Sequence, residues 1–276
     1  MVAHGDALAQ LAQAPVIQFL AQLRLADQDD LEKLALVRLE VREQSHLFEQ
    51  LVRQVLGFGS APVPPGSPEA NFAFANDNLG IGQVPDEVQR FHAFLRDRSP
   101  RVVCEIGTYS GGHFYLLSRS LPTVTTLIGL DLRVRNKALL RRLAPDNLDV
   151  HLIDGDSHGI PVRNAVEGAL GSQRLDVLFI DGDHTYDGVR SDYLNYRDLV
   201  RDGGVIAFHD IVEDHLTRFG RETKAWTGDV PLFWRRLKPH AETFVFVADP
   251  EQDGFGIGAL IHSEAKPIPA EFTAAP

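Results

Sequence analysis

Five short apolar runs, separated by helix-like stretches, are the feature of this sequence that most restricts its fold. The runs lie at residues 102–106, 126–130, 150–153, 177–180 and 205–208. The stretches between them, near residues 112–119, 135–143, 161–170 and 186–200, have helical patterns. Continuous apolar strands that alternate with helices are typical of a parallel sheet covered on both faces. The pattern therefore predicts an α/β, Rossmann-like fold with a mostly parallel sheet.

The C-terminal part of the chain has a different pattern. The stretches "TFVFVAD" and "GFGIGALI" have the composition of two strands, and a short acidic connection containing glycine joins them. We expect an antiparallel hairpin that completes a seven-stranded sheet. Before it, "VPLFWRRL" predicts a helix with Trp234 in the core, and "QVPDEVQRFHAFLRD" predicts a helix that begins near Pro85.

The N-terminal residues 1–59 are predicted to form a helical extension. Its apolar stripe packs either on its own domain or between subunits of a homo-oligomer. Residues 60–82 are rich in Pro, Gly and Asn, so we expect a linker or mobile flap there. The α/β domain then spans residues 83–265, and a tail covers 266–276. The apolar stripe of the N-terminal extension consists of Leu34, Val37, Val41, Phe48, Leu51 and Val55.

Composition excludes several partners. The formal net charge of -11 argues against a broad contact with nucleic acid, which needs Lys and Arg to neutralise phosphates. The single cysteine, Cys104, lies in a predicted strand, so no disulfide can form within the chain. We expect a cytoplasmic protein. The first twenty residues lack a basic segment and an unbroken apolar run, so we expect neither a signal peptide nor a membrane contact.

The stretch "VVCEIGTYSGGHF" joins the first predicted strand to a helix through a glycine turn. A dinucleotide fingerprint, G-x-G-x-x-G, fails here because Tyr109 occupies the position of its second glycine. A carboxylate at Glu105 repels a pyrophosphate but attracts a cationic amino group. Gly107 lets the backbone approach a ligand closely. The adjacent His113 has only a weak claim to function and is expected to start the helix.

Polar residues follow every predicted parallel strand, at the edge where open α/β sheets bind ligands. Asp131 follows the second strand and is suited to accept hydrogen bonds from both hydroxyls of a ribose. Asp156 and Ser157 follow the third strand, where an adenine is expected to pass. A ligand with a ribose, an adenine and an amino-acid end but no phosphate is S-adenosylmethionine, which we therefore expect as the cofactor.

The motifs "EIGTYSGG", "LIGLDL", "GDS", "LDVLFIDGDHTYDGVRSDY" and "LVRDGGVIAFHDI" resemble those of class I S-adenosylmethionine-dependent methyltransferases. The resemblance covers roughly residues 83–261 and points to the branch of cephalosporin-modifying and macrolide-sugar O-methyltransferases, whose members commonly bind a divalent metal. With the residues discussed above, it implies cofactor contacts at Glu105, Gly107, Thr108, Tyr109, Ser110, Gly111, Asp131, Leu132, Asp156, Ser157 and Asp181.

The resemblance also implies a metal site at the ends of the fourth and fifth strands. Asp181 and Asp210 would be ligands to a divalent metal, with Mg²⁺ expected. His209 occupies a place where relatives often have a carboxylate. It is a third ligand to a softer metal, a structural residue, or a partner that orients Asp210. His184 falls where the family has its general base, although it could instead cap the following helix.

The expected activity is methyl transfer to a hydroxyl of a small natural product or a sugar moiety. Residues 71–85 and 212–230 are expected to border the acceptor pocket. Two alternatives remain open at this stage. One is a non-catalytic S-adenosylmethionine-binding partner of a second enzyme, and the other is an NAD-dependent oxidoreductase, which Tyr109 and Glu105 disfavour.

Overall fold

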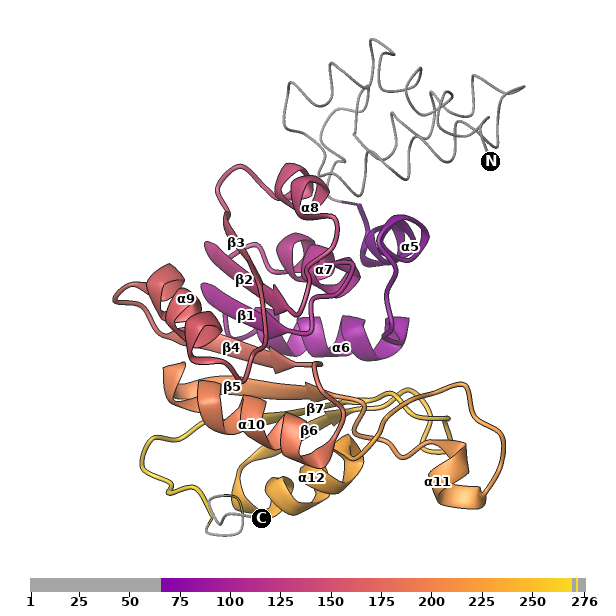
Figure 1. Ribbon diagram of the computed structural model, residues 1–276. Coiled ribbons are helices and arrows are strands. Elements are labelled where there is room, and N and C mark those ends of the chain that lie inside the picture. The colour runs from indigo at the N-terminus through magenta and orange to yellow at the C-terminus, as the bar shows by residue number, and fades with distance from the viewer. Residues whose placement is uncertain (1–65, 270–271, 273–276) are drawn as a thin grey trace, which may run out of the picture. The chain divides into compact units, whose positions relative to one another are not determined.

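The structure is a computed structural model, and it describes residues 66–269 and residue 272. Its centre is a seven-stranded sheet in the order β3-β2-β1-β4-β5-β7-β6 (Figure 1). The first five strands are parallel, and β7 runs antiparallel to both β5 and β6. The strands are β1 (Val102–Ile106), β2 (Thr126–Asp131), β3 (Asp149–Asp154), β4 (Leu175–Ile180), β5 (Val200–His209), β6 (Thr243–Phe246) and β7 (Ile257–Ile261).

Helices pack on both faces of this sheet, because alternate residues of its buried strands point to opposite sides. On one face Phe179 of β4 contacts Phe91, with ring centroids 5.7 Å apart. On the other face Leu178 shares a buried cluster with Tyr196. The first face carries α6 (Pro85–Arg96), and the second carries α9 (Ile160–Leu170), α10 (Tyr186–Tyr196) and α12 (Val230–Leu237).

Shorter elements complete the described chain. The helix α7 (Gly112–Ser120) follows the glycine turn, and α11 (His215–Phe219) follows β5. Two 3-10 turns, η1 (Arg197–Leu199) and η2 (Lys238–His240), follow α10 and α12. The helix α8 (Lys137–Leu143) is a further short helix, between β2 and β3 in the chain. Its last turn carries two arginines, which interact favourably with the helix dipole.

The predicted α/β order is confirmed, with all five parallel strands in place and the C-terminal hairpin at the edge of the sheet. The central runs became strands because both of their faces are covered, as the burial of every residue of β1 shows, whereas the edge strand β3 is fully buried only at Leu152. Trp234 is buried, as expected, and so is Cys104. Within the hairpin, β7 rather than β6 pairs with β5.

Residues 60–82 do not form one continuous linker, because α5 (Pro68–Asn78) lies within them. Ser67 caps this helix by accepting a hydrogen bond from the backbone N–H of Ala70, and Pro68 occupies the first helical position. A serine followed by a proline is a helix-start signal, which the high Pro, Gly and Asn content concealed. The stripe from Leu34 to Val55 lies outside the described residues, so subunit association through it stays a prediction.

No helix in the described part of the chain is both long enough and apolar enough to cross a membrane.

Candidate functional site

The glycine turn after β1 is shaped by the neighbouring strand. Gly107 has a φ of +88°, a conformation that disfavours residues with a side chain. A Cβ atom at this position would overlap the backbone carbonyl of Asp181, which follows β4. The expectation that Gly107 makes room for a ligand is therefore incomplete: its lack of a side chain is first required by packing within the protein. This close approach also brings the turn next to the end of β4.

The rest of the turn is tied to Asp131 at the end of β2. The N–H of Tyr109, which has a φ of +47°, donates to Asp131 Oδ2 at 2.8 Å. The N–H of Arg133 donates to Oδ1 at 3.0 Å. Each carboxylate oxygen has two lone pairs, so both oxygens can still accept from a ribose. Gly111, with a φ of +91°, is the N-cap residue of α7.

Glu105 is buried in the core behind the turn, with an exposed fraction of 2%. His113 Nδ1 donates to its Oε1 at 2.7 Å, and His113 Nε2 lies 3.2 Å from Nε2 of the buried His92. Burial raises the pKa of Glu105, and His113 opposes that rise. The other carboxylate oxygen of Glu105, Oε2, has no well-aligned hydrogen bond among the described residues. The nearby Thr108 hydroxyl nevertheless lowers the pKa of Glu105, as His113 does. His113 is thus both an early residue of α7 and the partner of Glu105.

Apolar side chains are exposed at the same edge of the sheet. Leu132, directly after β2, is 77% exposed, and Ile160, at the start of α9, is 76% exposed. Between β3 and α9, Asp156 Oδ1 accepts from the N–H of His158 at 2.9 Å. The Ser157 carbonyl accepts from the Tyr196 hydroxyl at 2.8 Å. This edge therefore offers both carboxylates and uncovered apolar groups.

The pair formed by His158 and Asp192 was not expected from the sequence. Asp192 lies on α10 and is fully buried, and its Oδ1 is 3.3 Å from His158 Nε2. The Asp192 carboxylate is the main cause that raises the pKa of His158 to about 9. A sequence signal was present: Asp192 follows Val189 and precedes Tyr193 and Tyr196 in the i, i+3, i+4, i+7 pattern of a buried helix face. A carboxylate on such a face requires a partner.

Two carboxylates and two histidines converge at the ends of β4 and β5. His209 Nδ1 lies 3.3 Å from both Asp181 Oδ1 and Asp210 Oδ2. His184 Nε2 lies 3.5 Å from Asp181 Oδ1. Gln83 also donates to Asp181, through Nε2 to Oδ2 at 2.6 Å. Asp210 has a φ of +60°, a left-handed conformation that aspartate tolerates better than most residues.

The charges in this cluster affect one another. Burial alone would raise the pKa of Asp181, but the imidazole of His209 and then that of His184 hold it well below its usual range. Burial alone would lower the pKa of His209, but Asp181 and Asp210 raise it far above its usual value. His209 is 3% exposed, so its interactions with the two carboxylates are buried.

The geometry brings together a candidate set of metal ligands that differs in one residue from the expected set. One potential ligand atom each from Asp181, His184 and Asp210 lies within 4.8 Å of the others. His209, for which a third-ligand role was one of three alternatives, points Nδ1 between the two carboxylates, while its Nε2 has no hydrogen-bond partner among the described residues. His184 therefore belongs to the candidate metal set as well as being the expected base.

The alternative in which His184 caps the following helix is not supported, because Thr185 holds that position. The Thr185 hydroxyl accepts from the N–H of Gly188 at 3.0 Å. His184 instead donates from Nδ1 to the carbonyl of Trp226 at 2.7 Å, and its ring stacks on the Trp226 indole at 4.8 Å between centroids. Burial alone would lower the pKa of His184, but Asp181 and Asp210 raise it. Trp226 was not singled out in the sequence.

Residues 104–211 match a family model described as a methyltransferase domain. The uncharacterized protein R132 of Acanthamoeba polyphaga mimivirus is 32% identical over 116 residues, which are 38% of this chain and 49% of that protein. The chain thus matches about half the length of this curated relative.

Two solved structures share the fold. An O-methyltransferase from Bacillus cereus, in complex with S-adenosylhomocysteine, is 18% identical, with a TM-score of 0.51 over 78% of this chain and 97% of that one. MycE, from the mycinamycin biosynthetic pathway, is 15% identical, with a TM-score of 0.50 over 89% and 64%. At these identities the two structures show the fold alone. The comparisons thus relate residues 104–211 of this chain to a methyltransferase domain.

Proposed function

We propose that this protein transfers the methyl group of S-adenosylmethionine to a hydroxyl of a small acceptor, with assistance from a divalent cation. One observation carries the proposal: the glycine turn after β1 lies directly against Asp181, the first member of the Asp181–His184–His209–Asp210 cluster. The N–H of Asp181 also donates to the carbonyl of Ile106 at 2.9 Å. A methyl donor bound at the turn would therefore lie next to carboxylate and imidazole groups that can accept or donate a proton.

The residues around the turn fit S-adenosylmethionine. The buried Glu105 has an oxygen, Oε2, without a well-aligned partner among the described residues, and it can accept from a cationic amino group. Asp131 retains lone pairs for the ribose hydroxyls. Leu132 is exposed at the edge where an adenine is expected. The remaining expected contacts, at Gly107, Thr108, Tyr109, Ser110, Gly111, Asp156, Ser157 and Asp181, lie on the adjoining loops.

The cluster also fits a divalent cation. Asp181 and Asp210 offer the oxygen atoms that Mg²⁺ prefers; the one lone pair of His184 Nε2, which could instead bind a softer metal, is assigned here to proton transfer. The carboxylates and imidazoles are held at the ends of two adjacent strands, and His184 is oriented by its bond to Trp226. A cation held there would lower the pKa of a bound hydroxyl. MycE has been solved with Mg and S-adenosylhomocysteine.

The orientation of His184 defines its part in the reaction. Because Nδ1 carries the hydrogen donated to the Trp226 carbonyl, the neutral ring has its lone pair on Nε2. Nε2 can therefore take the proton of the acceptor hydroxyl as the oxygen attacks the sulfonium methyl group. Asp181 and Asp210 stabilise the resulting imidazolium. The C–S bond breaks, its electron pair stays on sulfur, and neutral S-adenosylhomocysteine leaves.

The test combines binding with turnover. Calorimetry should detect S-adenosylhomocysteine binding in the micromolar range and no comparable binding of NAD; the reverse preference would overturn the cofactor assignment. An acceptor screen with labelled S-adenosylmethionine, over phenols and glycosides with Mg²⁺ or Mn²⁺, then reports methyl transfer. Cofactor binding without transfer to any acceptor would favour a non-catalytic binding protein. Full turnover in chelator would remove the cation from the proposal.

A further inference from the structure

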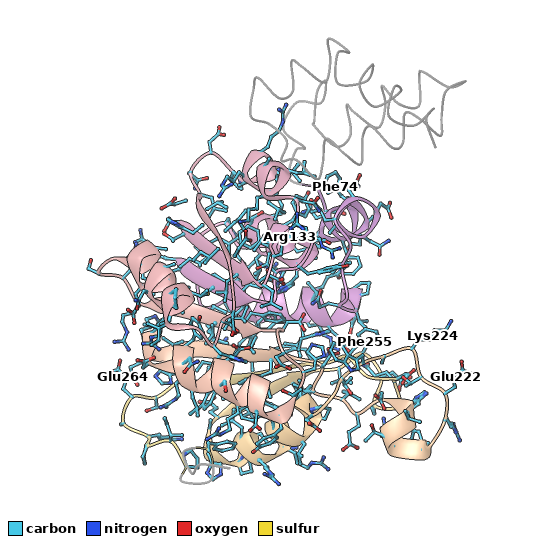
Figure 2. The ribbon with its side chains drawn as sticks, in the orientation of Figure 1. Phe74, Arg133, Glu222, Lys224, Phe255 and Glu264 are labelled. Atoms are coloured by element: carbon cyan, nitrogen blue, oxygen red, sulfur yellow. The ribbon has the colours of Figure 1, made fainter. Side chains whose placement is uncertain are left out.

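The segment between β5 and α12, residues 211–229, has unusually exposed apolar side chains. We call it the cap segment. Leu216 is 58% exposed, Phe219 is 45% exposed and Trp226 is 74% exposed. Figure 2 labels Glu222 and Lys224 on this segment, which projects from the sheet, and Phe255, near its base. The Phe255 ring centroid is 6.2 Å from that of His209. Exposed apolar groups beside a polar cluster are typical of a ligand-binding surface.

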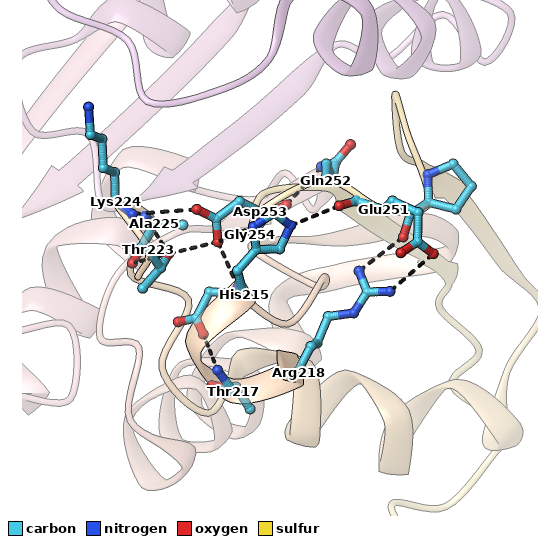
Figure 3. A network of polar contacts seen from close by, with 12 residues as sticks. His215, Thr217, Arg218, Thr223, Lys224, Ala225, Glu251, Gln252, Asp253 and Gly254 are labelled. Carbon is cyan, nitrogen blue, oxygen red and sulfur yellow. Dashed lines mark hydrogen bonds and ion pairs between the residues drawn. The ribbon is translucent and has the colours of Figure 1, made fainter. Parts of the chain in front are cut away.

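Asp253, in the connection between β6 and β7, holds the cap segment in place (Figure 3). Its Oδ1 accepts from the N–H of His215 and from the Thr223 hydroxyl, each at 2.7 Å. Its Oδ2 accepts from the N–H of Lys224 at 3.4 Å. Gly254 approaches the cap segment so closely that a Cβ atom there would lie 2.9 Å from Thr227 Cγ2. These contacts fix both the start and the later part of the cap segment.

The β6–β7 connection is itself anchored to the main fold by Glu87 of α6. This carboxylate is fully buried, and its Oε1 accepts from the N–H of Ala248 at 3.1 Å and from Gln252 Nε2 at 2.7 Å. Its Oε2 accepts from the N–H of Gly256 at 2.9 Å. Hydrogen bonds to a buried charge are among the stronger ones in a protein. The cap segment is therefore supported from the core of the sheet.

At its other end the cap segment is joined to His184. Besides the bond to the Trp226 carbonyl, the N–H of Asp229 donates to the His184 carbonyl at 2.7 Å. Gly228 has a φ of +54°, and a Cβ atom there would overlap the His184 backbone. One face of the Trp226 indole covers the His184 ring at an angle of 27°, yet the side chain remains 74% exposed. An uncovered flat surface thus adjoins the candidate base.

We propose that Trp226 determines which acceptor the enzyme uses, by stacking its exposed indole surface on a flat apolar face of the acceptor. An aromatic ring and the C–H face of a sugar ring share this chemistry. The inference rests on the proposed function, because it places the acceptor hydroxyl beside His184. Both contacts come from one residue: its carbonyl sets the tautomer of His184, and its side chain positions the acceptor.

Fluorescence offers a direct test, because the chain has two tryptophans and the other, Trp234, is buried. Catechol and methyl β-D-glucopyranoside serve as probes, titrated into the protein saturated with S-adenosylhomocysteine. We expect one of them to change the emission of Trp226. Trp226→Phe should lose this signal but bind that probe within about threefold of wild type by calorimetry, because a flat ring remains. Trp226→Leu should weaken binding roughly 3- to 30-fold, the weight of a stacking contact.

The outcomes separate this inference from the proposed function. With an acceptor that is turned over, Trp226→Leu should raise KM by a similar factor and change kcat little, because its backbone carbonyl still orients His184. The affinity for S-adenosylhomocysteine should stay unchanged. Val245→Ala, on the edge strand β6, removes another exposed apolar group and should change neither constant. Wild-type affinity in Trp226→Leu, or no response to either probe, would overturn the inference; probe binding without methyl transfer would instead count against the proposed function alone.

Discussion

Nδ1 of His184 donates a 2.7 Å hydrogen bond to the carbonyl oxygen of Trp226, 42 residues later in the chain. The bond assigns the hydrogen of the neutral ring to Nδ1 and leaves the lone pair on Nε2, which lies 3.5 Å from Asp181 Oδ1. A backbone carbonyl supplies this orientation, so it does not depend on the side chain at position 226. The role proposed for His184 rests on this orientation.

Replacing His184 by alanine should lower kcat by roughly 10²–10⁴-fold, the usual contribution of general acid–base catalysis. The affinity for S-adenosylhomocysteine should stay within about twofold, because His184 does not lie on the glycine turn. The measurement is steady-state turnover together with calorimetry. A fully active variant would leave His184 as a structural residue that anchors the cap segment.

Asp181→Ala and Asp210→Ala should both lose most of their turnover and any dependence on added Mg²⁺ or Mn²⁺. The two carboxylates face the same space at adjacent strand ends, so neither can hold a cation alone. His209→Gln is the informative companion variant, because it keeps a polar side chain but removes the imidazole between the carboxylates. Turnover in each variant, with chelator and with metal, is the measurement. Metal dependence that persists in Asp181→Ala would place the cation elsewhere.

Gly107→Ala should destabilise the protein by about 2 kcal/mol or more, through an unfavourable φ and overlap with the Asp181 carbonyl. Gly168→Ala is the matched control, since this glycine lies within α9 and a Cβ atom there has nothing within 4 Å. It should stabilise by roughly 0.5–1 kcal/mol, the usual gain for alanine over glycine in a helix. Denaturant unfolding measures both. Equal stability of Gly107→Ala and wild type would contradict the described turn.

The His158–Asp192 pair predicts a specific dependence of stability on pH. Because the pKa of His158 is raised to about 9 in the folded protein, the pair contributes its full stability below the ordinary histidine pKa of ~6.5. The contribution is lost as pH rises through about 9. Asp156 Oδ1, 3.7 Å from His158 Nδ1, supports the charged form, as does the Gly188 carbonyl.

Asp192→Asn tests this prediction, because it keeps the shape of the buried side chain and removes its charge. Wild type should melt at a higher temperature than the variant at pH 6, and the difference should shrink or change sign by pH 10. His158→Gln should likewise flatten the profile. A melting-temperature difference between wild type and Asp192→Asn that is constant with pH would show that the pair is not ionised.

The sequence predicted the parts of the molecule that depend on local pattern. The five apolar runs became the parallel strands, and Asp131 lies beside the glycine turn because adjacent parallel strands end at the same edge. Convergence of Asp181 and Asp210 followed from the same rule. These features need only strand order and the direction of the chain.

The parts that the sequence did not predict depend on contacts between distant segments. No local pattern relates Trp226 to His184, or Glu87 to the β6–β7 connection 161 residues later. The requirement for glycine at position 107 came from the neighbouring strand, which a ligand-based interpretation of the turn did not include. Asp192 was a different case. The helical spacing placed it on the buried face of α10, but no sequence pattern predicted that His158 would be its partner.

The position of β7 determines which parts of the sequence can be altered without affecting the glycine turn. Its first residue, Ile257, pairs with His209, the last residue of β5, so the chain enters β7 at the edge that carries the cluster. The β6–β7 connection and the cap segment therefore meet over one half of that edge, while the glycine turn and the loops after β2 and β3 form the other half. Under the proposed function, insertions or exchanges after residue 210 would change the acceptor side of the site and leave the methyl-donor side intact, so the C-terminal quarter of the chain is the natural place to graft new specificities.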